Sequence, residues 1–192
     1  MTTETSNIPV IAIDGPTASG KGSIASRVAQ ALGFHYLDSG ALFSMTALKC
    51  LQAGLDLADE AACGAAALAM DARFEGGRIL LDGADVTEDV RREEVGLAAS
   101  RVAVLPAVRS ALLALEHRAR RAPGLVADGR DMANVVFPDA GLKVFLTASA
   151  EARAKRRHKQ LLDKGISANL ASLAKDLEER DRRDPERKAA PG

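Results

Sequence analysis

The chain has 192 residues, 26 Lys and Arg balanced by 26 Asp and Glu, and a hydrophobic content of 47%. This length favours one compact domain, and the composition excludes a chain that is disordered throughout. The zero net charge argues against a uniformly basic surface for nucleic acid. Aromatic residues, at 3%, also leave little for stacking bases.

The sequence carries no sign of export or of a membrane anchor. Residues 1–7 lack the basic and apolar regions of a signal peptide, and no apolar run reaches the roughly 20 residues of a membrane span. Two cysteines, Cys50 and Cys63, are too few for a disulfide framework, so we expect both to be reduced. We therefore expect a cytoplasmic protein that acts without a membrane or nucleic acid partner.

The first third of the chain predicts the start of a βαβ unit. Ile8–Asp14 is almost continuously apolar and β-branched, like a strand buried on both faces of a parallel sheet. A glycine-rich turn follows, and then a helix over 21–32 that ends at Gly33. The next elements expected along the chain are a strand and two helices, at 34–37, 40–52 and 59–70.

Residues 71–87 interrupt this pattern. Short alternating segments there are separated by Gly76-Gly77 and Gly83, which predicts a small antiparallel sheet with tight turns. The remaining expected elements are two helices, two apolar strands and two charged helices, at 88–105, 106–121, 125–128, 142–146, 150–164 and 168–184. Strands that alternate with helices predict an α/β fold with a parallel sheet.

Charge is unevenly distributed along the chain. Residues 141–192 hold 13 of the 26 Lys and Arg but only 8 of the 26 Asp and Glu. A basic segment of this kind favours an element that handles phosphate groups. A helix with one solvated face would have the same composition, so the charge pattern leaves both interpretations open.

Gly15–Ser23 reads GPTASGKGS and contains the G-x-x-x-x-G-K core of a phosphate-binding loop. Glycines let the backbone wrap around an anion, and successive N–H groups then point at the phosphates, where Lys21 adds a positive charge. The hydroxyl that usually follows the lysine is displaced by one residue, to Ser23. The residues expected to bind the nucleotide here are Gly15, Pro16, Thr17, Ala18, Ser19, Gly20, Lys21, Gly22 and Ser23.

A loop that ends in Lys-Gly-Ser is typical of nucleoside monophosphate kinases, and the chain resembles the bacterial cytidylate kinase family from about Ile8 to Pro191. The resemblance rests on this loop together with LDSGALF at 37–43, EVGLAASRVAVLPAVRSALL at 94–113, LVADGRDMANVVFPDAGLKVFL at 125–146 and ERDRRD at 179–184. It implies an enzyme that moves the γ-phosphoryl group of ATP, with Mg²⁺, to CMP or dCMP.

The resemblance also implies an architecture. A three-layer core with a parallel sheet would carry a helical lid and an insert that binds the nucleoside monophosphate and contains a small antiparallel sheet. The expected boundaries are 8–38 and 106–150 for the core, 39–105 for the insert with its sheet at 71–87, 151–184 for the lid and 185–192 for a tail.

Single residues acquire roles from the same resemblance. The catalytic residues it implies are Lys21, Asp128, Arg130, Arg156 and Arg180. Arg157 would join the loop in binding ATP, Arg153 would be a further lid arginine, and Mg²⁺ is expected near Ser23 and Asp128. The acceptor nucleotide would contact Ser39, Ser100, Arg109, Arg130, Asp131, Arg183, Asp184 and Arg187. The carboxylate of Asp131 suits the amino group of cytosine, because a carboxylate accepts hydrogen bonds.

Each of these residues also has a purely structural interpretation. Ser39 would cap the helix that follows it, Ser100 would be a small helix residue, and Asp128 and Asp131 would be turn residues. The arginines would be solvated helix charges or partners in structural ion pairs.

Two features depart from the family's pattern. Ser44 follows Phe43 where the family has an arginine for the CMP phosphate, and loss of such a contact weakens binding by about 1.5–3 kcal/mol. The family's further C-terminal strand and helix are missing, so we expect an uncovered sheet edge that permits a family-like monomer to self-associate. Two alternatives remain open, namely a kinase for another small molecule and a nucleotide-binding relative with weak or no turnover.

Overall fold

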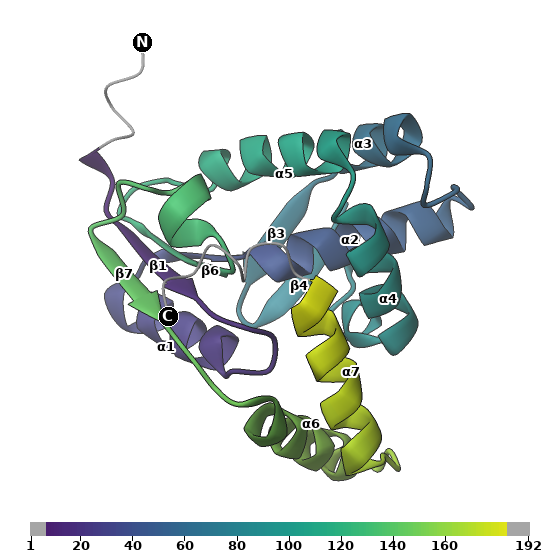
Figure 1. Cartoon of the computed structure of the whole chain (residues 1–192). Helices are drawn as coiled ribbons and strands as arrows, with labels where there is room; N and C mark the ends of the chain where they lie inside the picture. Colours follow the sequence, from purple (N-terminus) through teal and green to yellow (C-terminus); the bar gives the residue numbers. More distant parts are fainter. Residues whose placement is uncertain (1–6, 184–192) are drawn as a thin grey trace.

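Four parallel strands form the central sheet, in the order β2-β6-β1-β7 (Figure 1). The computed structural model describes residues 7–183. The strands are β1 (Val10–Asp14), β2 (His35–Asp38), β6 (Leu125–Gly129) and β7 (Leu142–Phe145). Every residue of β6 is buried, because strands flank it on both sides and helices cover both of its faces. The predicted parallel sheet is therefore confirmed.

Helices cover both faces of this sheet (Figure 1). They are α1 (Lys21–Leu32) on one face, and α2 (Ser39–Gln52) and α5 (Pro106–Arg118) on the other. Val126 belongs to the same core cluster as Ala29 of α1, whereas the next residue, Ala127, belongs to the cluster that contains Leu112 of α5. This alternation follows from the two-residue period of a strand. The core thus has the three layers that were predicted.

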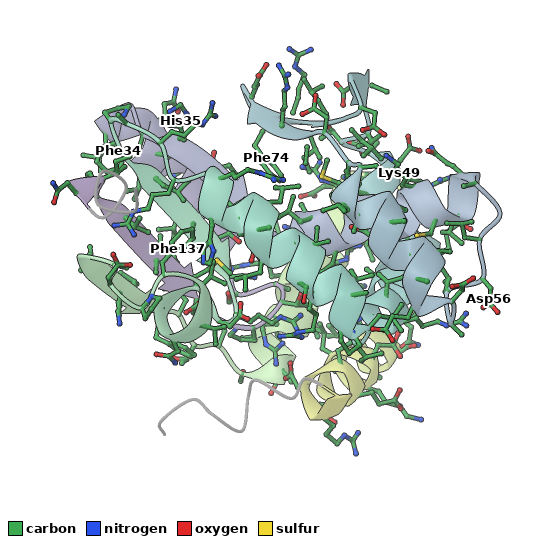
Figure 2. The ribbon with its side chains drawn as sticks, turned by 90° about the horizontal axis from the view of Figure 1, so that it is seen from above. Phe34, His35, Lys49, Asp56, Phe74 and Phe137 are labelled. Carbon is green, nitrogen blue, oxygen red and sulfur yellow. The ribbon has the colours of Figure 1, made fainter. Side chains whose placement is uncertain are left out.

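A second, antiparallel sheet lies beside β2 and has the order β3-β4-β5. Its strands are β3 (Ala72–Glu75), β4 (Arg78–Leu81) and β5 (Ala84–Asp85), which confirms the small sheet predicted at 71–87. Phe74 of β3 contacts Tyr36 of β2 edge to face, with ring centroids 6.0 Å apart. Figure 2 shows Phe74 between the small sheet and the core, where it joins the two sheets.

Two further helices complete the insert. The helix α3 (Glu60–Leu68) packs against α5, and α4 (Glu93–Val102) packs against α2. The prediction of one helix over 88–105 is wrong, because a 3-10 turn, η2 (Asp89–Arg91), is separated from α4 by the extended residue Arg92. Val90 and Val95 are five residues apart, so one continuous helix would point them in different directions. The break at Arg92 lets both enter the same core cluster.

The helices α6 (Ala150–Asp163) and α7 (Leu170–Arg183) pack side by side below the core (Figure 1). The hydroxyl oxygen of Ser149 caps α6 by accepting from the N–H of Ala152 at 3.1 Å, as its place before a helical pattern predicts. Leu177 of α7 is buried, as are Ala154 and Arg153 of α6. The two helices therefore bury apolar side chains together with one charged side chain.

The outer edge of β7 is the uncovered side of the central sheet as residues 7–183 form it. Leu142 and Phe145 of this strand are 53% and 49% exposed. Among the described residues, no single helix is long and apolar enough to cross a membrane, and α4 and α5 reach the length only as a pair bent by 102°.

Candidate nucleotide-binding site

The loop Gly15–Ser23 joins β1 to α1 and has the geometry of an anion-binding turn. Ala18 and Gly20 have φ angles of 59° and 87°, so the chain bends through two left-handed residues. No side chain caps the first turn of α1, which leaves its N–H groups directed toward the concave side of the loop. The hydroxyl of Ser19 is buried without a partner among the described residues. These features fit a bound phosphate chain, which would satisfy both sets of polar groups.

Gly20 is also the point where the lid meets the loop. A Cβ added at Gly20 would collide with the guanidinium of Arg156 from α6. Only glycine therefore allows both the left-handed backbone and this close approach. The structure brings the predicted catalytic residue Arg156 to the loop, as the resemblance implied.

Two carboxylates lie at the carboxyl ends of neighbouring strands, because Asp38 of β2 and Asp128 of β6 are register partners. Burial raises the pKa of Asp128 to about 7, and the charge of Asp38 adds to the rise. Burial also raises the pKa of Asp38. The positive charge of Lys21 lowers the pKa of both carboxyl groups and so opposes both rises. One cation at the base of the loop therefore stabilises the ionised form of two buried acids.

The hydroxyl of Tyr36 donates a hydrogen bond to Oδ2 of Asp128. Burial raises the pKa of Tyr36, which keeps the phenol protonated and able to donate. A Cβ added at Gly22 would lie 3.7 Å from the Tyr36 hydroxyl and 3.9 Å from Asp128 Oδ2. Gly22, where a metal-binding hydroxyl usually stands, is thus next to the Tyr36–Asp128 pair. Ser23, which carries the hydroxyl in this chain, is exposed on the first turn of α1.

Three arginines from three elements gather at the open end of the site. Burial lowers the pKa of Arg180 in α7, and the nearby guanidiniums of Arg130 and Arg157 lower it further. A Cβ added at Gly96 of α4 would lie 3.2 Å from Arg180 Nη2, so this side chain also reaches the insert. The charges of the predicted residues Arg130 and Arg157 therefore act on Arg180, and neighbouring like charges favour a bound polyanion.

Asp131 follows the arginine cluster and is held by Arg109 of α5, with 3.7 Å between its Oδ2 and Arg109 Nη2. Ser100 of α4 donates its hydroxyl to the carbonyl of Gly96 at 3.3 Å, on the stretch of helix that Arg180 approaches. These contacts link Asp131 to α5 and place Ser100 on the part of α4 that Arg180 approaches.

Ser39 is buried, and its hydroxyl donates to Oε1 of the buried Glu116 at 2.6 Å. The cap of α2 is instead Asp38, whose Oδ1 accepts from the N–H of Ala41 at 2.9 Å. The alternative interpretation of Ser39 as the helix cap is therefore wrong. A nucleotide that contacts Ser39 would therefore have to share the Ser39 hydroxyl with Glu116.

Asp14 and Tyr36 belong to the site but were not predicted. The carboxylate of Asp14 accepts from the N–H groups of Met132 and Ala133, each at 2.9 Å. It thereby holds the start of an unpredicted π-helix, η3 (Met132–Val136), and with it the preceding residues 130–131. An acid at the end of an apolar strand was the available signal for Asp14. No signal in the sequence pointed to Tyr36, because its contact with Asp128 depends on β2 and β6 being neighbours in the sheet.

The remaining predicted residues lie in the lid or beyond the described chain. Arg183 is the last residue of α7. The predictions for Asp184 and Arg187 fall outside the described residues. Arg153 lies in α6 as expected, but its side chain is fully buried and paired with Asp181 rather than directed into the site.

The chain is similar in sequence to known proteins over most of its length. The family model described as cytidylate kinase matches residues 11–191. The chain is 59% identical over 183 residues to the cytidylate kinase of Bordetella bronchiseptica, which covers 95% of this chain and 82% of the relative. The cytidylate kinase of Cupriavidus necator is 58% identical over 184 residues, covering 96% and 83%. That of Chromobacterium violaceum is 55% identical with the same coverage.

Proposed function

Since the chain belongs to the cytidylate kinase family, we propose that it transfers the γ-phosphoryl group of ATP to the phosphate of CMP or dCMP, which gives ADP and CDP or dCDP. The observation that carries the proposal is the phosphate loop itself, where the Ser19 hydroxyl is buried without a described partner and Gly20 lies against the guanidinium of Arg156. Arg130 and Arg157 lie near enough to Arg180 for their charges to lower its pKa. Mutual repulsion of the three guanidiniums is offset when two phosphate-bearing nucleotides enter between them.

The cytosine base is assigned to the space next to Asp131. The carboxylate accepts hydrogen bonds only, and the guanidinium of Arg109 holds it at 3.7 Å. The amino group of cytosine donates to such an acceptor, whereas the carbonyl oxygen of uracil at the same place would face a negative charge. An unpaired polar group of this kind supports strong discrimination against UMP.

The acceptor phosphate is assigned to Arg130 and Arg180. Position 44, where the family has an arginine, carries Ser44, and its hydroxyl donates to the carbonyl of Gly40 within α2 at 3.5 Å. Ser44 therefore adds no charge to the site. With fewer cations on the acceptor, we expect a weaker affinity for CMP than an arginine at position 44 would give.

The residues present fit Mg²⁺ carried by the nucleotide. Oxygen donors suit this ion, and it keeps several waters and binds through one or two carboxylates together with substrate phosphates. Within residues 7–183, no group of three or more His, Cys, Asp and Glu side chains could hold a metal by itself. Asp128, with Ser23 nearby on α1, would hold the ion, which when bound neutralises charge on the transferring phosphates.

The chain catalyses the transfer by positioning the two nucleotides and by neutralising the negative charge of their phosphates. The acceptor oxygen is already anionic, so no strong general base is needed. Lys21 and the N–H groups of the loop hold the phosphates of ATP, while Arg156 and Arg180 face the group in transfer. The helices α6 and α7 exclude water, which would otherwise accept the phosphoryl group in place of CMP.

The proposal is tested by measuring ADP formation with ATP and Mg²⁺ in the presence of CMP, dCMP, UMP or AMP. We expect turnover with CMP and dCMP, little with UMP, and none with AMP. Lys21→Ala should lower turnover by orders of magnitude with an unchanged unfolding temperature. Lys155→Ala, which removes an exposed lysine paired with Glu151 on α6, is the matched control. Binding of ATP without formation of ADP in the presence of CMP would refute the proposed reaction.

We further propose that the chain is active in the cytoplasm as a monomer that self-associates weakly through β7. Cys50 and Cys63 are free, buried thiols, which suits a reducing compartment. The exposed Leu142 and Phe145 on an edge strand favour contact with a second copy. Light scattering at increasing concentration tests this, and Phe145→Lys should remove any association.

A further inference from the structure

The two lid helices are joined to each other by a buried ion pair. Arg153 of α6 has a fully buried side chain, and Asp181 of α7 is 10% exposed. Nη1 of Arg153 lies 3.2 Å from one carboxylate oxygen of Asp181, and Nη2 donates to the other. The fork of the guanidinium therefore matches the carboxylate and fixes the two helices relative to each other.

The same guanidinium also reaches the phosphate loop. Its Nη1 donates to the carbonyl oxygen of Thr17 at 3.2 Å, and its Nε donates to the carbonyl of Ala148 at 3.2 Å. Thr17 is the third residue of the loop that binds phosphate. One side chain thus connects α6, α7 and the backbone of the loop.

The residues next to this pair are those that face the nucleotides. Arg156 and Arg157 follow Arg153 by three and four residues, so they share its face of α6. Arg180 immediately precedes Asp181 in α7. Because these guanidiniums repel one another, some attraction has to hold them in place before the nucleotides arrive. The Arg153–Asp181 pair contributes such an attraction at the base of the lid, beside the charges of Glu93 and Asp176, which act on Arg180.

We propose that Arg153 and Asp181 are positioning residues, which hold the lid helices against the carbonyl of Thr17 so that the loop and the lid arginines are placed together. This inference rests on the proposed phosphoryl transfer. A buried ion pair contributes little net stability compared with apolar residues of the same size. A pair retained for stability alone would therefore be replaceable, whereas a positioning pair would not.

The test compares variants that remove the pair with one that breaks an ion pair elsewhere. Arg153→Met combined with Asp181→Leu removes both charges and leaves no unpaired buried ion. Arg153→Lys keeps the charge but loses the fork. Asp139→Asn is the control, because it breaks a two-pronged pair with Arg120, with oxygens 2.9 and 3.0 Å from Nη1, on the opposite side of the core from the lid. For each protein, thermal unfolding, kcat, KM for ATP and for CMP, and ADP release without CMP are measured.

We expect the double variant to fold, to lose about 10²-fold in kcat/KM for ATP, and to release more ADP without CMP for each productive turnover. The KM for CMP should change little, and Arg153→Lys should fall between the double variant and wild type. The control should keep wild-type kinetics. A folded double variant with wild-type kcat/KM and no extra hydrolysis would overturn the proposal, and if that variant does not fold, wild-type kinetics in Arg153→Lys would do so.

A second measurement separates this proposal from the proposed reaction. The affinity of each variant for a fluorescent ATP analogue is determined without any acceptor. If wild type binds the analogue but does not phosphorylate CMP, the reaction assignment fails. The positioning proposal is then decided by whether removal of the pair weakens nucleotide binding by about 10-fold or leaves it unchanged.

Discussion

The buried carboxyl group of Asp128 lowers the stability of the fold near neutral pH. Its carboxyl group is buried beside Asp38, and burial is the main reason that its pKa rises from 3.8 to about 7. The hydrogen bond from Tyr36 and the charge of Lys21 oppose the rise without cancelling it. In the unfolded chain, the same carboxyl group regains its ordinary pKa.

The pH dependence of stability follows from this difference. From about pH 4 to about pH 7 the folded state keeps a proton on Asp128 that the unfolded state has released, so the free energy of unfolding falls as the pH rises. The interval spans about three pH units, which at 1.36 kcal/mol per unit corresponds to about 4 kcal/mol. This loss is complete above about pH 7, where both states are ionised at this position.

Asp128→Asn should remove this dependence. We expect a flatter plot of unfolding free energy against pH between 4 and 8, measured by urea denaturation with a chelator present. At pH 8 the gain of about 4 kcal/mol is partly offset by the buried amide group, at about 1–3 kcal/mol, and kinase turnover is lost. Asp82→Asn is a control of opposite sign, because a hydrogen bond from Lys49 lowers the pKa of Asp82. An Asp128→Asn protein that is less stable than wild type at pH 8, or equally dependent on pH, would refute the reasoning.

Three further predictions concern the loop, the turn after β6 and the core. Gly20→Ala should raise KM for ATP and cost about 1–2 kcal/mol of stability, since the residue is left-handed and its Cβ would displace Arg156; unchanged ATP titrations would contradict this. Asp14→Asn should lower the free energy of unfolding by about 1.5–3 kcal/mol and raise KM for CMP, because the carboxylate accepts hydrogen bonds from two backbone N–H groups and so holds residues 130–131. An unchanged KM for CMP would show that residues 130–131 keep their position without Asp14. Leu112→Ala should lower the free energy of unfolding, measured by urea denaturation, by about 2–5 kcal/mol without changing KM for ATP or CMP. A changed KM would mean that packing in the core affects the geometry of the site.

Local patterns in the chain were enough to predict most elements of the fold, although the break at Arg92 and the π-helix η3 were not predicted. The apolar run before Gly15, the loop itself and the helix that ends at Gly33 each depend on neighbouring residues only, and the structure has them where the sequence placed them. Pro106 at the start of α5 is a further case. Glycine, proline and hydrophobic periodicity act over a few residues, so they can be interpreted without knowledge of the tertiary fold.

Contacts between distant segments could not be predicted in this way. The strand order brings Asp38 and Asp128 together from positions 90 residues apart, and only this proximity reveals Tyr36 as the partner of Asp128. In the lid, the charge pattern of the sequence does not distinguish arginines that are buried from arginines that face the site. Packing alone decides that Arg153 turns inward to Asp181 while Arg156 reaches Gly20, because the burial of a charge depends on which elements surround it.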